Sequence, residues 1–230
     1  MTNNFLSQEI IDKVTTTMRI PDDKFNDYYL KVKNDIENSS DDLSYSIVDF
    51  RDFDEANEKG MLKNSIIIPK ELPFEKYIGN FLSPYARIIA ITNNDADYID
   101  VLIRLKHLYY SQIVGFVNFQ SLTENYHTEL YKMKQQEEVK PTDNLIDVRD
   151  PLEWDEGVVG NDNTIYMKML WVDYYWRKLD KSKTYSILCR GGVRSSIVTS
   201  YLNLRGINSI NVTGGTTKLL KQGMKFISKI

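Results

Sequence analysis

The stretch IVDFRD at residues 47–52 recurs as LIDVRD at residues 145–150, an offset of 98. A second pair of segments, RIIAIT at 87–92 and TYSILC at 184–189, repeats at an offset of 97. Two separated matches at nearly one offset indicate that a structural unit of about 95 residues occurs twice. In each copy a short Ile- and Val-rich run ends in Asp-x-Arg, which is typical of a buried strand followed by a polar turn.

Further short apolar runs follow in both copies. They lie at 65–69, 87–92 and 112–119 in the first copy and at 164–167, 184–188 and 208–212 in the second. Between the last two runs of each copy is an amphipathic stretch, at 97–110 or 195–205, whose apolar residues recur at helical spacing. Strands that alternate with helices predict an α/β fold with a mainly parallel sheet flanked by helices in each copy.

The repeat divides the chain into four predicted parts. Residues 1–42 fall outside it and contain two predicted helices, which we expect to pack against the first copy; the alternative is an arm that binds a partner. The first copy occupies residues 43–132 and the second occupies 143–230. Between them, the polar residues 133–142 are the predicted linker.

Composition excludes several classes of protein. With 230 residues, of which 42% are hydrophobic and 27% charged, the chain matches a packed protein rather than a disordered one. No apolar run approaches the ~20 residues that span a bilayer, and the polar start Met1–Asn4 lacks a signal pattern, so we expect a cytoplasmic protein without a membrane partner. The single cysteine, Cys189, excludes an internal disulfide, and His107 and His127 lack zinc-ligand spacing, so neither a metal nor a cofactor is expected.

Charge is unevenly distributed along the chain. Residues 181–230 contain nine Lys and Arg and no Asp or Glu, whereas the first 180 residues contain 20 Lys and Arg against 32 Asp and Glu. A basic segment can bind nucleic acid, but these charges lie within apolar patterning that lacks an RNA-binding motif or a recognition helix. We therefore expect no nucleic-acid partner. The basic segment is interpreted as a solvated face, or as one that attracts a small anionic substrate.

The segment CRGGVRSS at residues 189–196 carries the candidate chemistry. A predicted strand delivers Cys189 to a turn in which two glycines free the backbone, and a helix is expected to begin at Ser195. Successive amide N–H groups and the helix N-terminus can hold an anion there, and Arg190 and Arg194 add positive charge. Such surroundings favour a reactive thiolate. The alternative is that Cys189 is only a buried apolar residue, but burying so basic a loop without an anion would be costly.

With its surroundings, this loop resembles the rhodanese-like sulfurtransferases from residue 144 to about residue 223. The motifs that carry the resemblance are Asp147-Val148-Arg149, Glu153-Trp154, Gly157-Val158-Val159, the Cys189, Gly192, Arg194 and Ser195 pattern, Gly214-Gly215 and Gly223. One departure is Val158, where many members carry His. The resemblance implies two tandem rhodanese-like domains. The first would be inactive, because Thr92 stands where the cysteine should be and Asn93-Asn94-Asp95 follows it. The pair is also similar to the one found in some metallo-β-lactamase-fold persulfide dioxygenases, although this chain lacks their His-x-His-x-Asp-His metal motif.

The resemblance also implies a reaction and roles for the loop residues. A Cys189 persulfide would carry sulfane sulfur from thiosulfate or another persulfide to an external thiol or to cyanide. The implied donor is a small anion, the acceptor is a low-molecular-weight or protein thiol, and a protein partner in sulfur metabolism is an added expectation. The residues expected to bind the substrate are Arg190, Gly191, Gly192, Val193, Arg194 and Ser195.

Four residues in and around the loop have more specific expected roles. Arg190 is expected to recruit the donor anion, and Arg194 to brace the loop by binding carbonyls or a carboxylate such as Asp147. Asp147 and Arg149 are expected to act as supporting residues that tie the turn together.

Two other functions are compatible with a reactive cysteine. The first is a carrier or binding module that holds a persulfide without rapid turnover. The second is a cysteine phosphatase or arsenate reductase, which also closes a ring of amides with an arginine. Four residues separate Cys189 from Arg194, whereas the phosphatase signature has five, so we expect a ring too tight for a tetrahedral phosphate.

Overall fold

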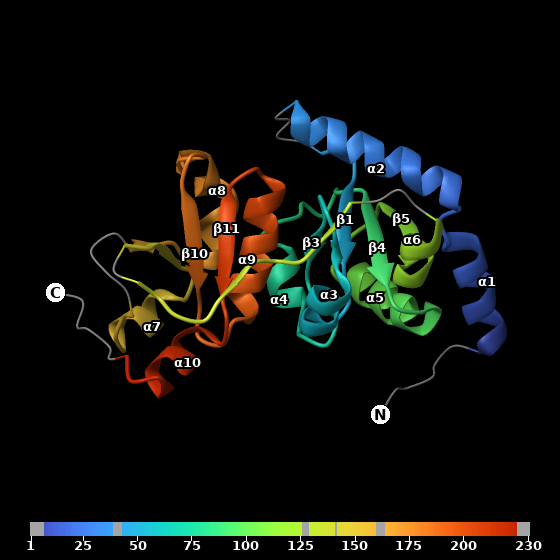
Figure 1. The fold of residues 1–230 in the computed structure, drawn as a ribbon. Helices are drawn as coiled ribbons and strands as arrows, with labels where there is room; N and C mark the ends of the chain where they lie inside the picture. The colour runs from blue at the N-terminus through green and yellow to red at the C-terminus, as the bar shows by residue number, and fades with distance from the viewer. Residues whose placement is uncertain (1–6, 39–42, 126–128, 141, 160–163, 225–230) are drawn as a thin grey trace. The chain divides into compact units, whose positions relative to one another are not determined.

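The computed structural model describes residues 7–38, 43–125, 129–140, 142–159 and 164–224 (Figure 1). The chain divides into two compact units, Met1–Leu130 and Tyr131–Ile230. Each unit has its own sheet and its own flanking helices (Figure 1). The predicted α/β class is therefore confirmed.

The first unit is built on a parallel sheet with the strand order β3-β1-β4-β5. Its strands are β1 (Ser46–Asp49), β3 (Ile66–Ile67), β4 (Ile88–Thr92) and β5 (Ile113–Asn118). The helices that follow the strands are α3 (Phe53–Lys59), α4 (Glu75–Ile78), α5 (Asp95–His107) and α6 (Phe119–Asn125). A short strand β2 (Met61–Leu62) pairs with β6 (Leu130–Tyr131) in a separate sheet.

The two N-terminal helices, α1 (Gln8–Met18) and α2 (Asp22–Glu37), pack on this unit. Phe25, Tyr29 and Val32 of α2 lie in the same buried cluster as residues of β1 and β4. Between the helices the chain runs beside β5, where Arg19 forms a parallel bridge with Phe116. Gly115 permits this approach, because a Cβ at that position would lie 2.3 Å from the carbonyl oxygen of Met18. One isolated bridge thus joins the residues before the repeat to the edge strand β5.

The second unit contains a parallel sheet with the strand order β7-β11-β10-β8-β9. Its strands are β7 (Gln135–Gln136), β8 (Asn144–Asp147), β9 (Ile165–Tyr166), β10 (Thr184–Leu188) and β11 (Asn208–Val212). The helices are α7 (Pro151–Asp155), α8 (Val172–Tyr175), α9 (Val193–Leu204) and α10 (Gly215–Lys221), with short 3-10 turns η1 (Met169–Trp171) and η2 (Trp176–Lys178) on either side of α8. Residues 133–142, expected to be a linker, therefore contribute an edge strand to this sheet.

The two sheets share one topology. The order β3-β1-β4-β5 in the first unit corresponds to β9-β8-β10-β11 in the second. Each central strand ends in a buried ion pair, Asp49 with Arg51 at 2.6 Å and Asp147 with Arg149 at 2.8 Å. Arg51 also donates to the carbonyl of Gly60, as Arg149 does to that of Gly157. These shared features support a duplication, which stays a prediction of the sequence repeat.

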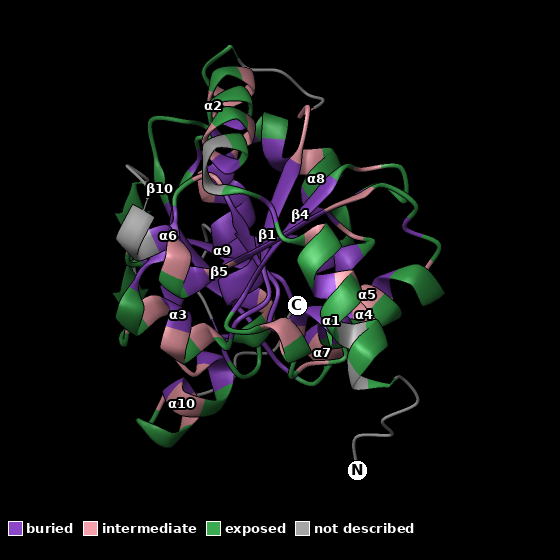
Figure 2. Ribbon diagram, turned by 90° about the vertical axis from the view of Figure 1, so that its right-hand side faces the viewer, coloured by how far each residue is buried: buried purple, intermediate pink, exposed green. Residues whose placement is uncertain are grey.

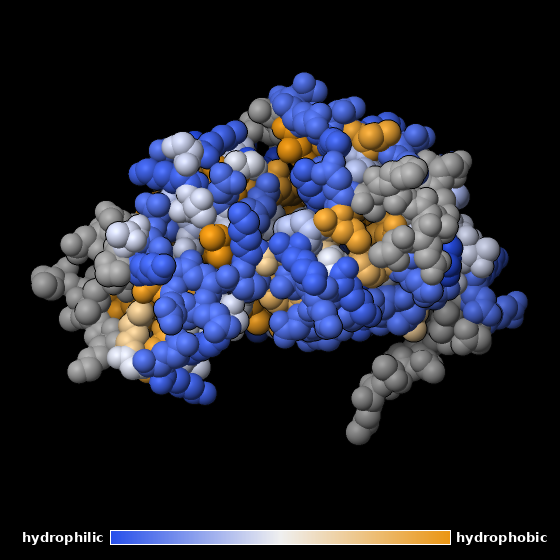
Figure 3. Space-filling model, in the orientation of Figure 1, coloured by the Kyte–Doolittle hydropathy of each residue, from blue (hydrophilic) through white to orange (hydrophobic). Residues whose placement is uncertain are grey.

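Burial on both faces explains why the sequences of the central strands are continuous apolar runs. Every residue of β1 and β4 is buried, and so are most residues of α9, while the outer helices expose one face (Figure 2). Parallel strands covered on both faces have no polar alternation. Most of the surface drawn in Figure 3 is hydrophilic, with small apolar patches. Among the described residues no helix has the length and apolar character needed to cross a membrane.

Candidate active site

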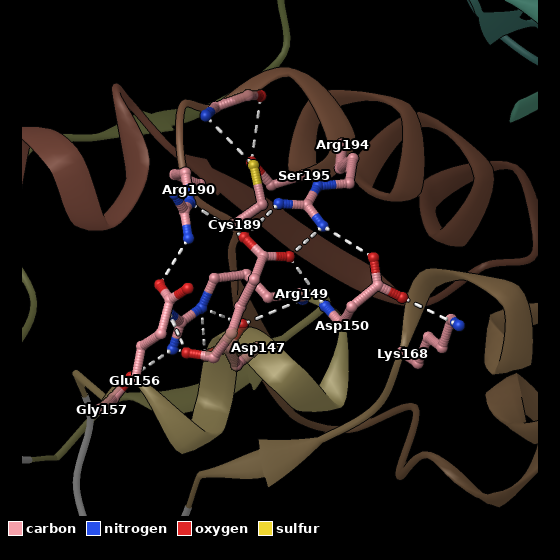
Figure 4. Close-up of polar contacts among 12 residues, drawn as sticks. Asp147, Arg149, Asp150, Glu156, Gly157, Lys168, Cys189, Arg190, Arg194 and Ser195 are labelled. Atoms are coloured by element: carbon pink, nitrogen blue, oxygen red, sulfur yellow. Dashed lines mark hydrogen bonds and ion pairs between the residues drawn. The ribbon is translucent and has the colours of Figure 1, made fainter. Parts of the chain in front are cut away.

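The loop after β10 curls around the sulfur of Cys189 (Figure 4). The backbone N–H of Gly192 donates to Cys189 Sγ at 3.1 Å, and Ser195 Oγ lies 3.3 Å from the same sulfur. Gly192 has φ +96°, a left-handed conformation that favours glycine. Cys189 is 1% exposed, so the loop excludes most water from the thiol. Helix α9 begins at Val193, two residues before the predicted start, which places Arg194 and Ser195 in its first turn.

Two backbone hydrogen bonds from α10 hold the cysteine loop in place. Thr216 N donates to the carbonyl of Cys189 at 2.8 Å, and Thr217 N donates to the carbonyl of Arg190 at 3.0 Å. A Cβ on Gly215 would lie 2.1 Å from that Cys189 oxygen, so the contact requires glycine. Sequence reasoning noted the Gly214-Gly215 pair only through the family resemblance. It did not identify Thr216 and Thr217, whose backbone contacts leave no sequence signal.

Arg194 is held by a carboxylate, but not by the one expected. Its two terminal nitrogens contact the two oxygens of Glu153 at 2.6 and 2.8 Å, and one of them lies 3.5 Å from Asp150. Asp147, the carboxylate named from the sequence, is fully buried and binds Arg149 instead. Burial is the largest single influence and opposes ionisation of Glu153, but the hydrogen bonds from Arg194, Asp150 N and Arg190 and the charge of Arg194 together outweigh it and lower the pKa of Glu153 to about 2. The hydrogen bond with Glu153 raises the pKa of Arg194.

Arg190 is also paired. Its Nε donates to Glu153 at 3.0 Å and its Nη2 to Glu156 at 2.7 Å, so the guanidinium lies toward the carboxylates of α7 and the residue that follows it (Figure 4). The Arg190 side chain is 53% exposed and can reach solvent. Recruitment of the donor by Arg190 stays a prediction.

A network of ion pairs thus joins the cysteine loop to α7 and the residues that flank it. Lys168 completes it, because its Nζ lies 2.9 Å from Asp150. We define the charged rim as Lys168, Arg190, Arg194, Asp150, Glu153 and Glu156. Sequence reasoning named only the two arginines as site residues. The available signal for Glu153 was the Asp150-x-x-Glu153 capping box, in which Asp150 N donates to Glu153 Oε2 at 3.0 Å.

The buried pair Asp147–Arg149 supports the rim indirectly. Arg149 Nη1 donates to the carbonyl of Glu153 at 3.0 Å, and Nη2 donates to the carbonyl of Gly157 at 3.0 Å. These bonds link the middle of α7, and Gly157 just beyond the end of this helix, to the end of β8. Asp147 and Arg149 thus hold α7 in place, and α7 carries Glu153, which binds Arg194 of the loop.

The corresponding loop of the first unit lacks these elements. Thr92 is 1% exposed and its hydroxyl donates to the carbonyl of Asn94. Asn94 caps α5, and Asn93 donates to Glu55, the residue that stands 98 positions before Glu153. Neither a thiol nor an arginine is present in residues 92–95.

The described residues contain no group of three His, Cys, Asp or Glu side chains arranged to hold a metal ion. His127, considered in the sequence analysis, lies outside the described residues.

Comparison with known proteins assigns this geometry to a family. The family model of the rhodanese-like domain matches residues 126–222. YtwF of Bacillus subtilis (strain 168), named as a candidate sulfurtransferase, is 38% identical over 71 residues, which are 31% of this chain and 67% of YtwF. The chain belongs to the rhodanese-like family. The rhodanese-like domain includes β8 to α10 and hence the whole cysteine loop and its charged rim.

Two further proteins are similar to parts of this chain. A tRNA sulfurtransferase of Histophilus somni (strain 129Pt) is 24% identical over 103 residues, which are 44% of this chain but only 21% of that relative. A solved rhodanese-like domain protein from Staphylococcus aureus is 30% identical and is covered over 100% of its length by 42% of this chain, with a TM-score of 0.36. Proteins named as sulfurtransferases are thus among the relatives of this chain.

Proposed function

We propose that this protein is a sulfurtransferase in which Cys189 carries sulfane sulfur from thiosulfate or a persulfide to an external thiol or cyanide. The observation that carries the proposal is the hydrogen bond from Gly192 N to Cys189 Sγ inside a closed glycine loop. Amides that point at one sulfur stabilise negative charge there, both on the thiolate and on the outer sulfur of a persulfide. Membership of the rhodanese-like family and sulfurtransferase relatives support the same reaction.

The reaction proceeds in two displacement steps. The Cys189 thiolate attacks the outer sulfur of the donor, a Cys189–sulfur bond forms, the donor sulfur–sulfur bond breaks, and sulfite or a thiolate leaves with the electron pair. An acceptor thiolate then attacks the outer sulfur of the Cys189 persulfide and releases the Cys189 thiolate. With cyanide as acceptor the product is thiocyanate. The chain has one cysteine, so the acceptor thiol is external.

The residues of the cysteine loop have different roles in the proposed reaction. The backbone N–H groups of Gly191, Gly192 and Val193 hold the reacting sulfurs, and Ser195 adds a hydroxyl beside Cys189 Sγ. Arg194 braces the first turn of α9 through Glu153. The exposed side chain of Arg190 contacts the part of the donor that leaves as sulfite or as a thiolate.

The proposal extends to the rest of the chain. The first unit would be a degenerate rhodanese-like domain, supported by the common strand order and by the absence of a thiol at Thr92. Its likeness to the rhodanese pair of persulfide dioxygenases stays a prediction. The proposed setting is the cytoplasm, where low-molecular-weight and protein thiols are kept reduced, with a partner protein in sulfur metabolism as donor or acceptor.

Sulfur loading followed by turnover tests the proposal. The protein is incubated with thiosulfate or with a persulfide, and the intact mass is measured before and after addition of a thiol acceptor. We expect one added sulfur atom that the acceptor removes over many cycles. Cys189→Ser should abolish loading and leave the melting temperature within a few degrees of the wild type.

The same assay separates the other functions. Loading without repeated turnover would indicate a persulfide carrier. Hydrolysis of an aryl phosphate without any sulfur loading would contradict the proposal and favour a cysteine phosphatase.

A further inference from the structure

The charged rim neutralises itself. Its three cations, Lys168, Arg190 and Arg194, each lie within ion-pair distance of at least one of its three carboxylates (Figure 4). Arg194 uses both terminal nitrogens on Glu153, and Arg190 is divided between Glu153 and Glu156. The six groups have no net charge. Once Cys189 is ionised, the loop and its described rim together carry one negative charge.

The basic character of the C-terminal segment does not change this balance. Of its described cations, only Arg190 and Arg194 belong to the rim. Arg205 stacks on Trp176 and Tyr201, and Lys218 pairs with Glu137. The segment 181–230 is therefore basic in composition, while the rim around the thiol keeps no unpaired positive charge among the described residues.

This charge balance distinguishes the two classes of donor. In thiosulfate a sulfonate group is bonded directly to the sulfur that is transferred, so a dianion must enter beside the Cys189 thiolate. In an organic persulfide a thiol sulfur attached to carbon takes that place, and its immediate surroundings are apolar. Repulsion between like charges a few ångströms apart is substantial where water is excluded, as it is around the 1% exposed Cys189.

Two exposed apolar residues, one in the loop and one next to a rim carboxylate in the sequence, fit the second class. Val193, the residue that follows Gly192, is 40% exposed, and Leu152, beside Glu153, is 79% exposed. A carbon chain can contact such side chains, whereas a sulfonate cannot use them.

We propose that the physiological donor is an organic persulfide, carried by a small thiol or by a protein, and that the charged rim disfavours inorganic thiosulfate. This inference rests on the proposed function. In the loading step the Cys189 thiolate attacks the outer sulfur of R–S–SH, the sulfur–sulfur bond of the donor breaks, and RS⁻ leaves with the electron pair. Cys189–S–SH keeps the proton, and no oxidant or reductant is consumed.

The test compares two donors on the full-length protein. The probes are thiosulfate and the persulfide of 2-mercaptoethanol, and the loading rate constant of Cys189 is measured by intact mass under single-turnover conditions. Each rate is divided by the rate of free cysteine with the same donor, which removes the intrinsic reactivity of the donor. We expect this normalised rate to favour the organic persulfide by about tenfold.

A charge variant makes the comparison specific to the rim. Glu156→Gln removes the rim carboxylate that is 61% exposed and frees one side of Arg190. We expect the ratio of thiosulfate loading to persulfide loading to rise about fivefold. Glu137→Gln is the matched control, because Glu137 is 69% exposed, has an ion pair with Lys218, and lies outside the rim. It should leave the ratio unchanged.

Ionic strength gives an independent readout. Salt weakens attraction and repulsion between exposed charges alike, so thiosulfate loading of the wild type should stay constant or increase between low and high salt. A steep decrease with salt, or a normalised preference for thiosulfate, or an unchanged ratio in Glu156→Gln, would overturn the inference. Loading by neither donor would overturn the proposed function and this inference with it.

Discussion

Replacement of Gly215 by alanine should disable the cysteine loop although residue 215 does not touch the sulfur. Gly215 has φ +58°, and an added Cβ would lie 2.1 Å from the carbonyl oxygen of Cys189 and 2.7 Å from the carbonyl carbon and oxygen of Arg190. Ordinary contact needs well over 3 Å, so the loop or α10 must shift by about 1 Å or more. The peptide groups of Cys189 and Arg190, whose carbonyls bind Thr216 N and Thr217 N, would have to move.

The expected magnitudes follow from these contacts. A left-handed alanine costs about 1 kcal/mol, and loss of two backbone hydrogen bonds costs about 1 kcal/mol each, so the free energy of unfolding should fall by about 3 kcal/mol. A displacement of about 1 Å at a reacting atom typically lowers the rate about 100-fold. We therefore expect Gly215→Ala to remain folded at room temperature and to load sulfur about 100-fold more slowly.

The assay is single-turnover loading followed by mass, with urea unfolding measured on the same samples. Gly206→Ala is the matched control, because Gly206 also has positive φ, +75°, but an added Cβ would contact nothing within 4 Å. It should lose about 1 kcal/mol of stability and retain its loading rate. Normal loading by Gly215→Ala, or an equal loss of rate in both variants, would refute the idea that α10 positions the loop.

Three further predictions concern the ionic and degenerate sites. The pKa of Glu153 is lowered from 4.5 to about 2, so its ionised form stabilises the folded state above pH 4.5, and this contribution is lost as the pH falls toward 2. Glu153→Gln should therefore lower the free energy of unfolding by about 3 kcal/mol at pH 7 and reduce its dependence on pH between 4.5 and 2, measured by urea unfolding. Parallel pH profiles of the two proteins would contradict this prediction. Asp147→Asn should lower the free energy of unfolding by about 3 kcal/mol, because it leaves the buried charge of Arg149 unpaired, and a change in melting temperature of only a degree or two would argue against this. Thr92→Cys in a Cys189→Ser background should take up no sulfur in the mass assay, because the loop after Thr92 lacks the glycines of the Cys189 loop. Sulfur uptake by this variant would show that the loop of the first unit can still stabilise a persulfide.

The sequence predicts the central strands and the cysteine loop well for a physical reason. Strands covered on both faces need continuous apolar residues, so β4 is visible as the Ile-rich run IIAIT. The loop around Cys189 is visible because its left-handed turn requires Gly192. Local requirements of this kind leave local signals.

The rim and the edge strand β7 depend on distant contacts and leave weaker signals. Glu153 and Glu156 meet Arg190 only because β8 and β10 are neighbours in the sheet, and spacing along the chain does not encode that pairing. Strand β7 is polar, and its glutamine side chains bind the sheet through Asn211 and Ser186. A run of glutamines matches a linker in composition, so the hydrophobic pattern misassigned it.

The edge strand β7 determines where the rhodanese-like domain can be separated from the rest of the chain. A fragment that starts at Asp143, as the repeat suggests, would remove Gln135 and Gln136 and leave Asn211 and Val212 of β11 without their backbone partners. Unpaired strand edges attract other strands, so such a fragment should self-associate at concentrations where a fragment starting at Tyr131 stays monomeric.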